Sequence, residues 1–469
     1  MITYIKINGF KSFRNFEMEF APLTVIAGAN ASGKSNLFDA LHLLSRLAET
    51  DLKTAFQEQR GNPDELFTQY GENWYSRQME FTVEMLLNRT VRDNWGGESD
   101  LKYTRLRYIL TIKRLTNDRG FEDLAVAYEE LENLKHDKDT WVKKFISKEY
   151  LEHWRPQVKT GKRTTPYIYT EEQNGIPTIF VSQDGKSGNK KTFLADASQT
   201  VLSSFNSVDF KHILGAKEEM RSWKFLQLNP EDLREPTRQD VGMRDTITQS
   251  GKNLAAALFR IKMKDDFLLK EISRKFNNFL HNFTDVSVED DKAGRQFIIR
   301  LRGEEGLEFS SRVLSEGTLR LLTLCIFQYD DQHRSLLCFE EPENGIHPFR
   351  MDAMAQLIRD LAADFADREM PLRQVIVNTH SPVLVSKFIQ LKKDNNVSIW
   401  LSQLITLITD IAEDGNKRIK MRITRMLPVE KEKQTLPGFS EQDRKLTISE
   451  VIRYLETADA ETAIKEITR

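Results

Sequence analysis

The feature that most constrains this chain is the stretch APLTVIAGANASGKSNLFDALHLL at residues 21–44. Leu23 to Ala27 is a short run rich in β-branched residues, which predicts a strand. Ser35 to Leu47 carries leucine and phenylalanine at helical spacing, which predicts an amphipathic helix. The loop between them has the pattern G-x-x-x-x-G-K-[ST]. The sequence therefore predicts a strand, a glycine-rich loop and a helix, in this order.

Each residue type in this loop has a physical reason to bind phosphate. Gly28 and Gly33 let backbone N–H groups approach phosphate oxygens, and the N-terminus of the helix adds partial positive charge. We expect Lys34 to place its ammonium between the β- and γ-phosphates of a nucleotide and Ser35 to offer its hydroxyl to Mg²⁺. The alternative is a glycine-rich turn that caps an ordinary helix, which the eight matching positions disfavour.

A second candidate is the segment SLLCFEEP at residues 335–342, an apolar run that ends in two adjacent acids. Adjacent residues of a strand face opposite sides of a sheet. We therefore assign Glu340 to the Mg²⁺ shell and Glu341 to the attacking water, which it orients or deprotonates. The alternative is an acidic turn after a buried strand, a common feature that becomes less plausible beside a phosphate loop.

A third candidate is His380, in the segment QVIVNTHSP at residues 374–382. The β-rich run predicts a strand that ends just before the histidine. Ligands of doubly wound sheets lie at the carboxyl ends of the parallel strands, so we expect His380 beside Glu341 at the γ-phosphate. A neutral imidazole there can hydrogen-bond the phosphate and sense its presence. The alternative is a structural histidine.

The segment VLSEGTLR at residues 313–320 opens an apolar helix before the acidic strand. Ser315, Gly317 and the helix N-terminus form a second anion-binding surface. One nucleotide cannot easily touch both this surface and the phosphate loop of one compact protomer. Two protomers related by two-fold symmetry solve this, because each presses its Ser315 cap onto the phosphate held by Lys34 of the other. The alternative is an ordinary capped helix.

The composition is that of a folded protein with more than one lobe. The chain has 469 residues, of which 39% are hydrophobic and 29% charged, and this length predicts two or three lobes. The net charge of −2 excludes a uniformly basic protein, so any nucleic-acid contact needs a local basic surface. Cys325 and Cys338 lie in apolar runs and are expected to be buried, reduced thiols. No run reaches the ~18 apolar residues of a membrane span, and we expect a cytoplasmic protein without membrane contact.

Taken together, the motifs resemble a known class of ATPase. INGFKSF at residues 7–13, the phosphate loop, LSEGT, LLCFEEPENGIHP and VNTHSP resemble the ABC-type ATPase heads of the SMC, RecF and OLD group. The chain is most similar to the stand-alone RecF/OLD-like AAA ATPases of bacteria, several of which serve anti-phage systems such as Septu and PARIS. The resemblance covers residues 1–90 and 220–390. It implies an α/β fold with a mixed sheet and helices on both faces, and ATP and Mg²⁺ as cofactors.

The resemblance extends the predicted site beyond the loop. It implies that the nucleotide is touched by residues before the first strand, in the loop and at the start of the helix. It also implies contacts from the other protomer through the segment VLSEGTLR at residues 313–320, which stands in the place of the signature motif. These residues are Lys11, Ser12, Gly28, Asn30, Gly33, Lys34, Ser35, Asn36, Ser315 and Gly317. The group also has a glutamine that contacts Mg²⁺ and lies between the first helix and the next strand. Our candidate is Gln69, with Gln78 as the rival and a plain surface glutamine as the alternative. Residues 343–347 stand in the place of the D-loop.

Departures from the group's pattern narrow the biological role. Glu340 stands where ABC heads commonly have aspartate, which lengthens the arm by one methylene. The signature reads LSEGT and not the LSGGQ of transporters, which argues against a transporter subunit. No long heptad run and no CxxC hook is visible, which argues against SMC-like tethering. No EGxxE or DxD-like pair after His380 matches the nuclease domain of OLD enzymes, so we expect a separately encoded nuclease or toxin effector.

The chain is predicted to have four parts. Residues 1–94 form the N-terminal lobe of the ATPase head and residues 221–390 its C-terminal lobe. Residues 95–220 form an inserted α+β subdomain. Residues 391–469 form an extension in which no chemistry is evident, and which is expected to dock a partner or a second copy, or to complete the lobe.

The insertion is locally basic, with twelve Lys or Arg and seven Asp or Glu in residues 135–191. Trp141, Trp154, Tyr167 and Tyr169 are interleaved with the basic loops KTGKR and GKSGNKK. Such loops contact the nucleic-acid backbone, and aromatic side chains stack on bases. The insertion is thus a candidate for DNA contact, and the alternative is an ordinary solvated face, which a run of charges usually is.

These inferences favour an ATPase whose homodimer, or a larger homo-oligomer, closes on ATP and opens after hydrolysis. We expect this cycle to sense or regulate a nuclease or toxin in anti-phage defence. Two alternatives stay open. The first is a RecF-like repair ATPase that acts directly on DNA, and the second is a nucleotide-gated scaffold in which hydrolysis is secondary.

Overall fold

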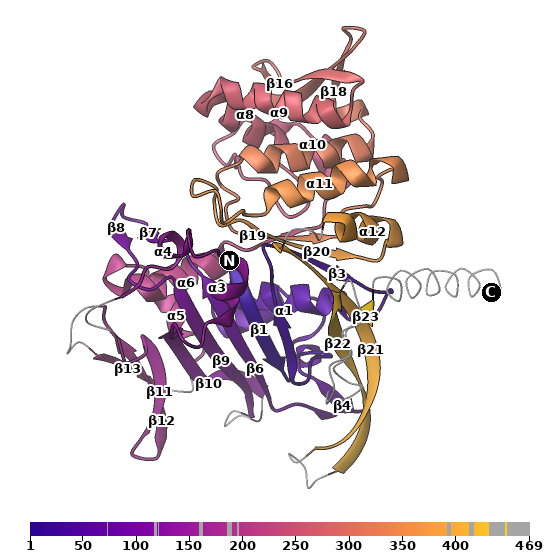
Figure 1. Ribbon diagram of the computed structural model, residues 1–469. Helices are drawn as coiled ribbons and strands as arrows, with labels where there is room; N and C mark the ends of the chain where they lie inside the picture. The colour runs from indigo at the N-terminus through magenta and orange to yellow at the C-terminus, as the bar shows by residue number, and fades with distance from the viewer. Residues whose placement is uncertain are drawn as a thin grey trace, which may run out of the picture.

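The chain forms an upper and a lower lobe that meet at one central sheet (Figure 1). The computed structural model describes residues 1–72, 74–116, 120, 122–158, 163–184, 190–194, 197–391, 395–411, 417–430 and 446–447.

In the described part of the chain, the central sheet is mixed and has seven strands. Their order is β14 (Lys224–Leu226), β19 (Leu336–Glu340), β20 (Gln374–Thr379), β3 (Leu23–Ala27), β21 (Val397–Ile411), β22 (Lys417–Glu430) and β23 (Leu446–Thr447). The first five strands are parallel, and β22 runs antiparallel to β21. The register places Glu340 beside Asn378 and Thr379 beside Ala27. The carboxyl ends of β19, β20 and β3 therefore lie side by side.

Both faces of the central sheet are covered. Because side chains alternate along a strand, Ile26 of β3 joins the core around α1 (Lys34–Leu47), whereas Val25 and Ala27 join the core on the other face. That second core is built with α10 (Glu316–Tyr329), α11 (Met351–Leu361) and α12 (Pro382–Leu391). The predicted α/β fold, a mixed sheet with helices on both faces, is confirmed.

A second, antiparallel sheet, with eight strands among the described residues, covers α1 from the other side. Its order is β13 (Lys190–Leu194), β12 (Ile176–Ser182), β11 (Ile168–Gln173), β10 (Glu122–Asn133), β9 (Arg105–Thr116), β6 (Gln78–Leu86), β1 (Ile2–Asn8) and β2 (Phe16–Glu19). The helices α2 (Leu52–Gln57), α5 (Val201–Ser204) and α6 (Lys211–Arg221) complete this layer. Buried phenylalanines such as Phe10 and Phe81, whose ring centroids are 5.8 Å apart, fill the space between the sheet and α1.

The upper lobe contains a small sheet and two more helices (Figure 1). Its elements are β15 (Thr237–Arg238), α8 (Leu254–Lys264), α9 (Asp266–Phe279), β16 (Phe283–Asp291), β17 (Gln296–Gly303) and β18 (Glu308–Ser310). The remaining short elements are η1 (Pro63–Leu66), β4 (Gln69–Gly71), β5 (Trp74–Tyr75), β7 (Thr90–Arg92), β8 (Glu98–Asp100), α3 (Thr140–Phe145), α4 (Leu151–Trp154), η2 (Val208–Phe210), α7 (Pro230–Arg234), η3 (Ser311–Val313) and η4 (Pro348–Arg350).

The sheets cross the predicted boundaries between the four parts. The eight-stranded sheet joins β1 and β6 of residues 1–94 to β9 and β10 of residues 95–220. The central sheet joins β3 to β19 and β20 of residues 221–390 and to β21 and β22 of residues 391–469. The four-part division stays a prediction, and the structure shows that its parts share cores.

The four aromatic side chains of the basic insertion do not serve as stacking platforms. Trp141, Trp154, Tyr167 and Tyr169 are all buried, and their exposed fractions are at most 8%. Trp141 Nε1 donates to the Phe20 carbonyl oxygen at 2.6 Å. The predicted base stacking is therefore wrong, because these rings fill the hydrophobic core. Most of KTGKR and GKSGNKK lies outside the described residues.

Both cysteines behave as the sequence predicts. Cys325 and Cys338 are buried and free, and burial raises the pKa of each thiol. Of the helices in the described part of the chain, none combines the length and the apolar character that crossing a bilayer requires.

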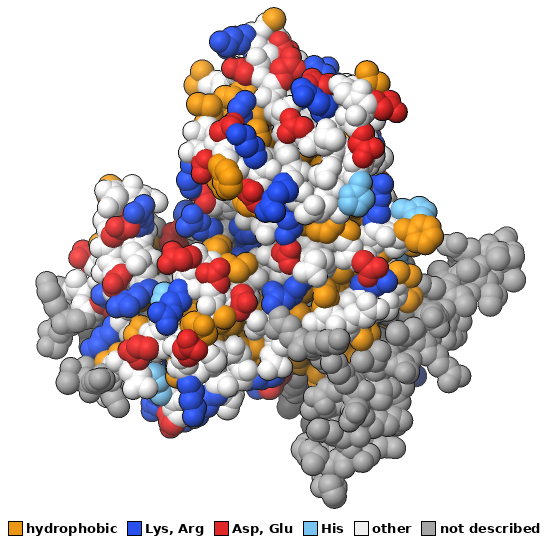
Figure 2. Space-filling view, turned by 45° about the horizontal axis from the view of Figure 1, so that its top comes forward, with side chains coloured by type: hydrophobic (Ala, Val, Ile, Leu, Met, Phe, Trp, Pro, Cys, Tyr) orange, Lys and Arg blue, Asp and Glu red, His pale blue; other side chains and the backbone are white. Residues whose placement is uncertain are grey.

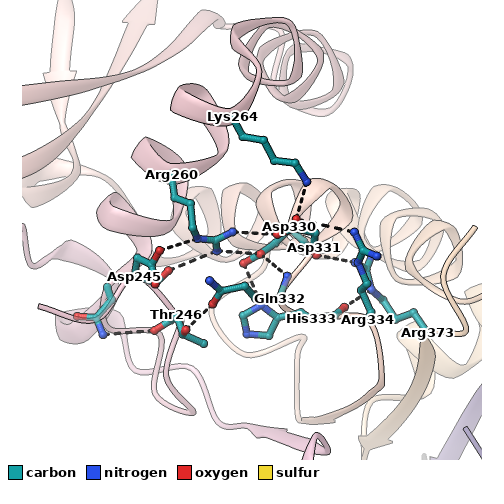
Figure 3. Close-up of polar contacts among 11 residues, drawn as sticks. Asp245, Thr246, Arg260, Lys264, Asp330, Asp331, Gln332, His333, Arg334 and Arg373 are labelled. Atoms are coloured by element: carbon teal, nitrogen blue, oxygen red, sulfur yellow. Dashed lines mark hydrogen bonds and ion pairs between the residues drawn. The ribbon is translucent and has the colours of Figure 1, made fainter. Parts of the chain in front are cut away.

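A buried ion cluster ties the end of α10 to α8 and to the start of β20 (Figure 3). The fully buried carboxylate of Asp330 accepts hydrogen bonds from Arg260 Nη2 and from the backbone N–H of Gln332, and it lies near His333 Nδ1, each at 2.9 Å. Arg373 Nη2 donates to the Asp330 carbonyl oxygen at 3.0 Å. Burial by itself raises the pKa of Asp330, but the His333 contact and the other donors lower it to about 2. The cluster therefore holds a charged carboxylate inside the protein.

Replacing Asp330 with alanine is expected to reduce the free energy of unfolding by ~3 kcal/mol or more, because Arg260 and His333 lose their buried partner. Urea unfolding at pH 7 measures this. The contribution of Asp330 is present above its unfolded pKa of about 3.9 and is lost as the pH falls toward 2. The control is Asp331→Ala, which removes a carboxylate with a 33% exposed side chain and should cost less than ~1 kcal/mol. Equal losses in the two variants would contradict this account.

Candidate nucleotide-binding site

The loop between β3 and α1 folds around its own lysine. Gly33 lies in the left-handed region with φ of 89°, and a Cβ there would lie 1.8 Å from Thr424 Oγ1. Glycine is therefore required at this position. The buried Lys34 ammonium donates to the carbonyl oxygens of Gly28 and Ala29, each at 2.8 Å. The loop thus gathers a fixed positive charge at the carboxyl end of β3.

A hydroxyl, a carboxylate and an amide meet beside this loop. Ser35 Oγ donates to Glu340 Oε1 at 2.8 Å, and Asn378 Nδ2 approaches the same hydroxyl at 3.5 Å. Asn378 Oδ1 is buried and has no hydrogen-bond partner among the described residues. Oxygen atoms of these three kinds are ligands that Mg²⁺ prefers. These residues therefore fit a Mg²⁺ ion.

The described residues do not form a complete metal site by themselves. No group of three His, Cys, Asp or Glu side chains in that part of the chain is placed to hold a metal ion. Mg²⁺ usually binds one or two carboxylates together with substrate phosphates. A Mg²⁺ ion at Ser35 and Glu340 would accordingly need a nucleotide to complete its shell.

Glu341 and His380 form an ion pair at the ends of β19 and β20. His380 Nδ1 lies 3.0 Å from Glu341 Oε1, and Asn344 Nδ2 donates to Glu341 Oε2 at 3.1 Å. The His380 hydrogen bond is the main cause that lowers the pKa of Glu341 to about 2. The same bond raises the pKa of His380. The pair therefore favours a charged imidazolium, where the sequence led us to expect a neutral imidazole.

The backbone of Glu341 is strained at this point. Its φ is +47°, a left-handed conformation that is uncommon for residues other than glycine. Its N–H donates to the Asn378 carbonyl oxygen at 2.8 Å, which anchors the turn to β20. Such strain is often found at functional sites. At this turn the chain leaves the direction of β19, and the Glu341 side chain points to His380.

The signature segment packs against the loop that follows the two acids. A Cβ at Gly317 would lie 2.8 Å from the Gly345 carbonyl oxygen, so this contact requires glycine. Ser315 caps α10, and its Oγ lies 2.8 Å from Thr318 Oγ1. Glu343 in the same loop is buried, bonds Thr379 Oγ1, and has its pKa raised by desolvation. The D-loop position and the signature helix thus touch within one chain.

The residues before the first helix also reach α1. Lys11 Nζ forms an ion pair with Asp39 Oδ2 at 2.7 Å, and Ser12 Oγ accepts from Asn36 Nδ2 at 2.7 Å. Asn30 is exposed at the tip of the loop. The structure therefore brings Ser12 and Asn36 together near the start of α1. Lys11 contacts α1 about one turn further along the helix, at Asp39.

The two predicted glutamines are not brought to the site. Gln69 is exposed in β4 and donates to the Gly71 carbonyl oxygen at 3.1 Å. Gln78 is exposed in β6 and donates to Glu80 Oε1 at 2.8 Å. Three other glutamines, Gln59, Gln227 and Gln249, line a cavity of about 130 Å³ together with Glu340, and Gln227 follows the last residue of β14.

Sequence reasoning missed several residues that the structure places at the site. Asn378 stands two residues before His380 and was detectable as a polar residue within an apolar strand. Arg60 Nη2 pairs with Glu340 Oε2 at 3.2 Å, although nothing in its surroundings in the sequence marks it. Ser402 and Thr424 of the C-terminal strands contact the phosphate loop from the side.

The match to a protein family covers both lobes. Residues 23–386 match the family described as “AAA domain, putative AbiEii toxin, Type IV TA system”. This is well over half of the sequence. The chain belongs to this AAA domain family. The phosphate loop, the two acids and His380 lie inside the matched residues, whereas Ser402 and Thr424 lie outside them.

Two solved structures to which this AAA domain protein is similar are SMC head domains. The SMC head domain from Thermotoga maritima is 12% identical with a TM-score of 0.36, covering 92% of this chain and 99% of that one. The Smc head domain with an extended coiled coil from Pyrococcus furiosus, bound to the C-terminal domain of ScpA, is 12% identical with a TM-score of 0.41, covering 91% and 96%. No curated protein matches the sequence. The family assignment therefore comes from the sequence match.

The pKa of His380 is expected to fall toward the unperturbed value of about 6.5 when Glu341 is replaced with glutamine, because the carboxylate stabilises the imidazolium. NMR titration of the His380 ring in both proteins measures this. In the wild type the ion pair should be present above the Glu341 pKa of about 2 and be lost as the pH rises through the raised pKa of His380. The control Asn344→Ala keeps the carboxylate and should keep the pKa raised. An unchanged titration in Glu341→Gln would refute the pairing.

Proposed function

We propose that this chain binds ATP with Mg²⁺ at the carboxyl ends of β3, β19 and β20 and hydrolyses it to ADP and phosphate. The contact between Ser35 Oγ and Glu340 Oε1 at 2.8 Å carries the proposal. It joins the phosphate loop to an acidic strand far away in the sequence, which is the pairing that a Mg²⁺–nucleotide site needs. Membership of an AAA domain family supports it.

The residues of the site divide the work of hydrolysis. Lys34 and the loop N–H groups hold the β- and γ-phosphates, and Ser35 with Glu340 holds Mg²⁺. Mg²⁺ held there would supply charge neutralisation for the phosphates. Glu341 orients the attacking water and accepts its proton. A carboxylate with a pKa near 2 is a weak base. When His380 turns to the γ-phosphate, Glu341 loses the hydrogen bond that lowers its pKa and becomes more basic.

Two copies of the chain complete the site in this proposal. Ser315 and Gly317 lie at the start of α10 in the upper lobe, and the phosphate loop lies at the base of that lobe (Figure 1). A two-fold homodimer lets each Ser315 cap the γ-phosphate of the other subunit through its helix N-terminus. A larger homo-oligomer can be built from such dimers.

The proposed role of the cycle is to regulate a separately encoded nuclease or toxin in anti-phage defence in the cytoplasm. The description of the matched family, which names a toxin of a type IV toxin–antitoxin system, supports a role of this kind. The alternative of an ATPase acting directly on DNA loses one support, because the four aromatic residues of the insertion are buried. The scaffold alternative shares this site and differs in whether hydrolysis is needed.

Lys34→Ala is expected to weaken ATP affinity at least ~10-fold, because charge-assisted hydrogen bonds to phosphate are lost. Glu341→Gln is expected to keep ATP affinity and to lower kcat by ~10²- to 10⁴-fold, because it removes the base and preserves the shape of the pocket. Fluorescent-nucleotide binding and phosphate release measure the two effects. Lys53→Ala, at an exposed ion pair, is the control for lost charge.

The same samples test pairing of subunits by analytical ultracentrifugation. Glu341→Gln with ATP should sediment as a dimer, and the added substitution Ser315→Ala should weaken that dimer. Wild-type turnover per subunit should fall on dilution. Turnover that is unaffected by Lys34→Ala would contradict the proposed site, and turnover that is constant down to the monomer would contradict the dimer.

We further propose that Gln227 is the glutamine that contacts Mg²⁺. β14 is parallel to β19 and its last residue, Leu226, pairs with Phe339, so Gln227 leaves β14 at the edge where Glu340 ends β19, and both residues line the same cavity. Gln69, exposed in β4, shows no comparable placement. An amide oxygen beside Glu340 adds a ligand of the type that Mg²⁺ prefers.

Gln227→Ala is therefore expected to raise the Mg²⁺ concentration needed for half-maximal ATPase activity by about tenfold, the size of effect typical for residues around a metal site. The control is Gln69→Ala, which should leave the Mg²⁺ requirement unchanged. A Mg²⁺ titration of ATPase activity compares the two variants. The opposite order of effects would return the assignment to Gln69.

A further inference from the structure

The C-terminal strands, in which the sequence showed no chemistry, lie against the phosphate loop. β21 pairs in parallel with β3, and Leu401 stands beside Ala27. The next residues are Ser402 in β21 and Gly28, the first residue of the loop, so β21 brings Ser402 beside the start of the loop. A Cβ at Gly28 would lie 2.7 Å from the Ser402 carbonyl oxygen. The two backbones are therefore in close contact where the loop begins.

Two buried hydroxyls converge on one carbonyl group of the loop. Ser402 Oγ donates to the Ser32 carbonyl oxygen at 2.9 Å, and Thr424 Oγ1 of β22 approaches the same oxygen at 3.4 Å. The residues Ser402 and Thr424 are 0% and 2% exposed. Water is thus excluded from these bonds, and their loss leaves a buried carbonyl oxygen poorly satisfied.

Thr424 also links the loop to the start of α1. Its Oγ1 lies 2.6 Å from Ser12 Oγ, which accepts from Asn36 Nδ2 at 2.7 Å. Each hydroxyl has one proton. All three contacts are satisfied when Asn36 donates to Ser12, Ser12 donates to Thr424, and Thr424 donates to the Ser32 carbonyl oxygen. Such a directed chain strengthens each bond within it.

We propose that Thr424 and Ser402 are positioning residues that hold the phosphate loop in its nucleotide-binding shape. They act through the Ser32 carbonyl oxygen and the space beside Gly33, and they do not themselves touch the phosphates. The C-terminal hairpin of β21 and β22 is thereby part of the nucleotide site. This deepens the proposed ATP-binding function and rests on it for its consequence, whereas the holding of the loop can be tested without nucleotide.

Hydrogen exchange followed by mass spectrometry, on the full chain without nucleotide, tests the holding directly. Thr424→Val keeps the shape of the side chain and removes the hydroxyl, and it should speed exchange of the amides in residues 28–36 at least about fivefold, the factor for one lost hydrogen bond of ~1 kcal/mol. Thr424→Ser restores a hydroxyl and should exchange as the wild type does. Unchanged exchange in Thr424→Val, or equal acceleration in both variants, would overturn the proposal.

A second pair of variants covers the case in which Thr424→Val does not fold. Ser402→Ala should also speed exchange in residues 28–36. Ser398→Ala is its matched control, because Ser398 lies in the same strand and bonds Thr24 Oγ1 at 3.1 Å, away from the loop. Equal effects of Ser402→Ala and Ser398→Ala, or no effect of Ser402→Ala, would overturn the proposal.

Nucleotide affinity separates this inference from the proposed function. Thr424→Val and Ser402→Ala should each raise the Kd for ATP and the KM about fivefold while kcat changes less than twofold, because a misplaced loop binds phosphate less well and the acids stay in place. A wild-type protein that binds no ATP would refute the proposed function and leave the exchange result standing. A wild-type protein that binds ATP, with variants of unchanged Kd, would refute the inference itself.

Discussion

Side-by-side pairing of three parallel strands is the constraint on which the rest of this structure depends. β3, β20 and β19 are hydrogen-bonded in this order, and their registers align Ala27 with Thr379 and Asn378 with Glu340. The residues that follow each strand therefore emerge at one edge of the sheet. The phosphate loop, the two acids and His380 owe their proximity to this pairing, although the loop precedes the acids and His380 by more than 300 residues in sequence.

Charged side chains lie at this edge of the sheet and also at the far end of the signature helix α10. Lys34 supplies a buried positive charge at the loop, and its charge helps to lower the pKa of Glu341, which pairs with His380. Further from the edge, the Asp330 cluster anchors the C-terminal end of α10, whose N-terminal end carries Ser315. The upper lobe is thereby fixed to the sheet at the base of the signature helix. Its face toward solvent carries mixed charges with scattered apolar side chains (Figure 2).

Local patterns predicted the parts of the site that are contiguous in sequence. β3 spans the predicted residues Leu23–Ala27, and α1 begins at Lys34, one residue before the predicted start. Gln227 escaped notice because β14 has three residues and owes its place to pairing with β19. Ser402 lies 370 residues from Ser32, and no local pattern reports such a contact. The aromatic residues of the insertion were wrongly interpreted as stacking platforms. The sequence does not show whether an aromatic side chain between basic residues points into the core or toward solvent.

The central claim is that the edge formed by β3, β19 and β20 is where a nucleotide triphosphate binds. A crystal structure of the Glu341→Gln variant soaked with ATP and Mg²⁺ tests it most directly. The account predicts triphosphate density along the loop, with the metal ion between Ser35 and Glu340. Density for the triphosphate at any other place, with Lys34 still hydrogen-bonded to the carbonyl oxygens of Gly28 and Ala29, would contradict it.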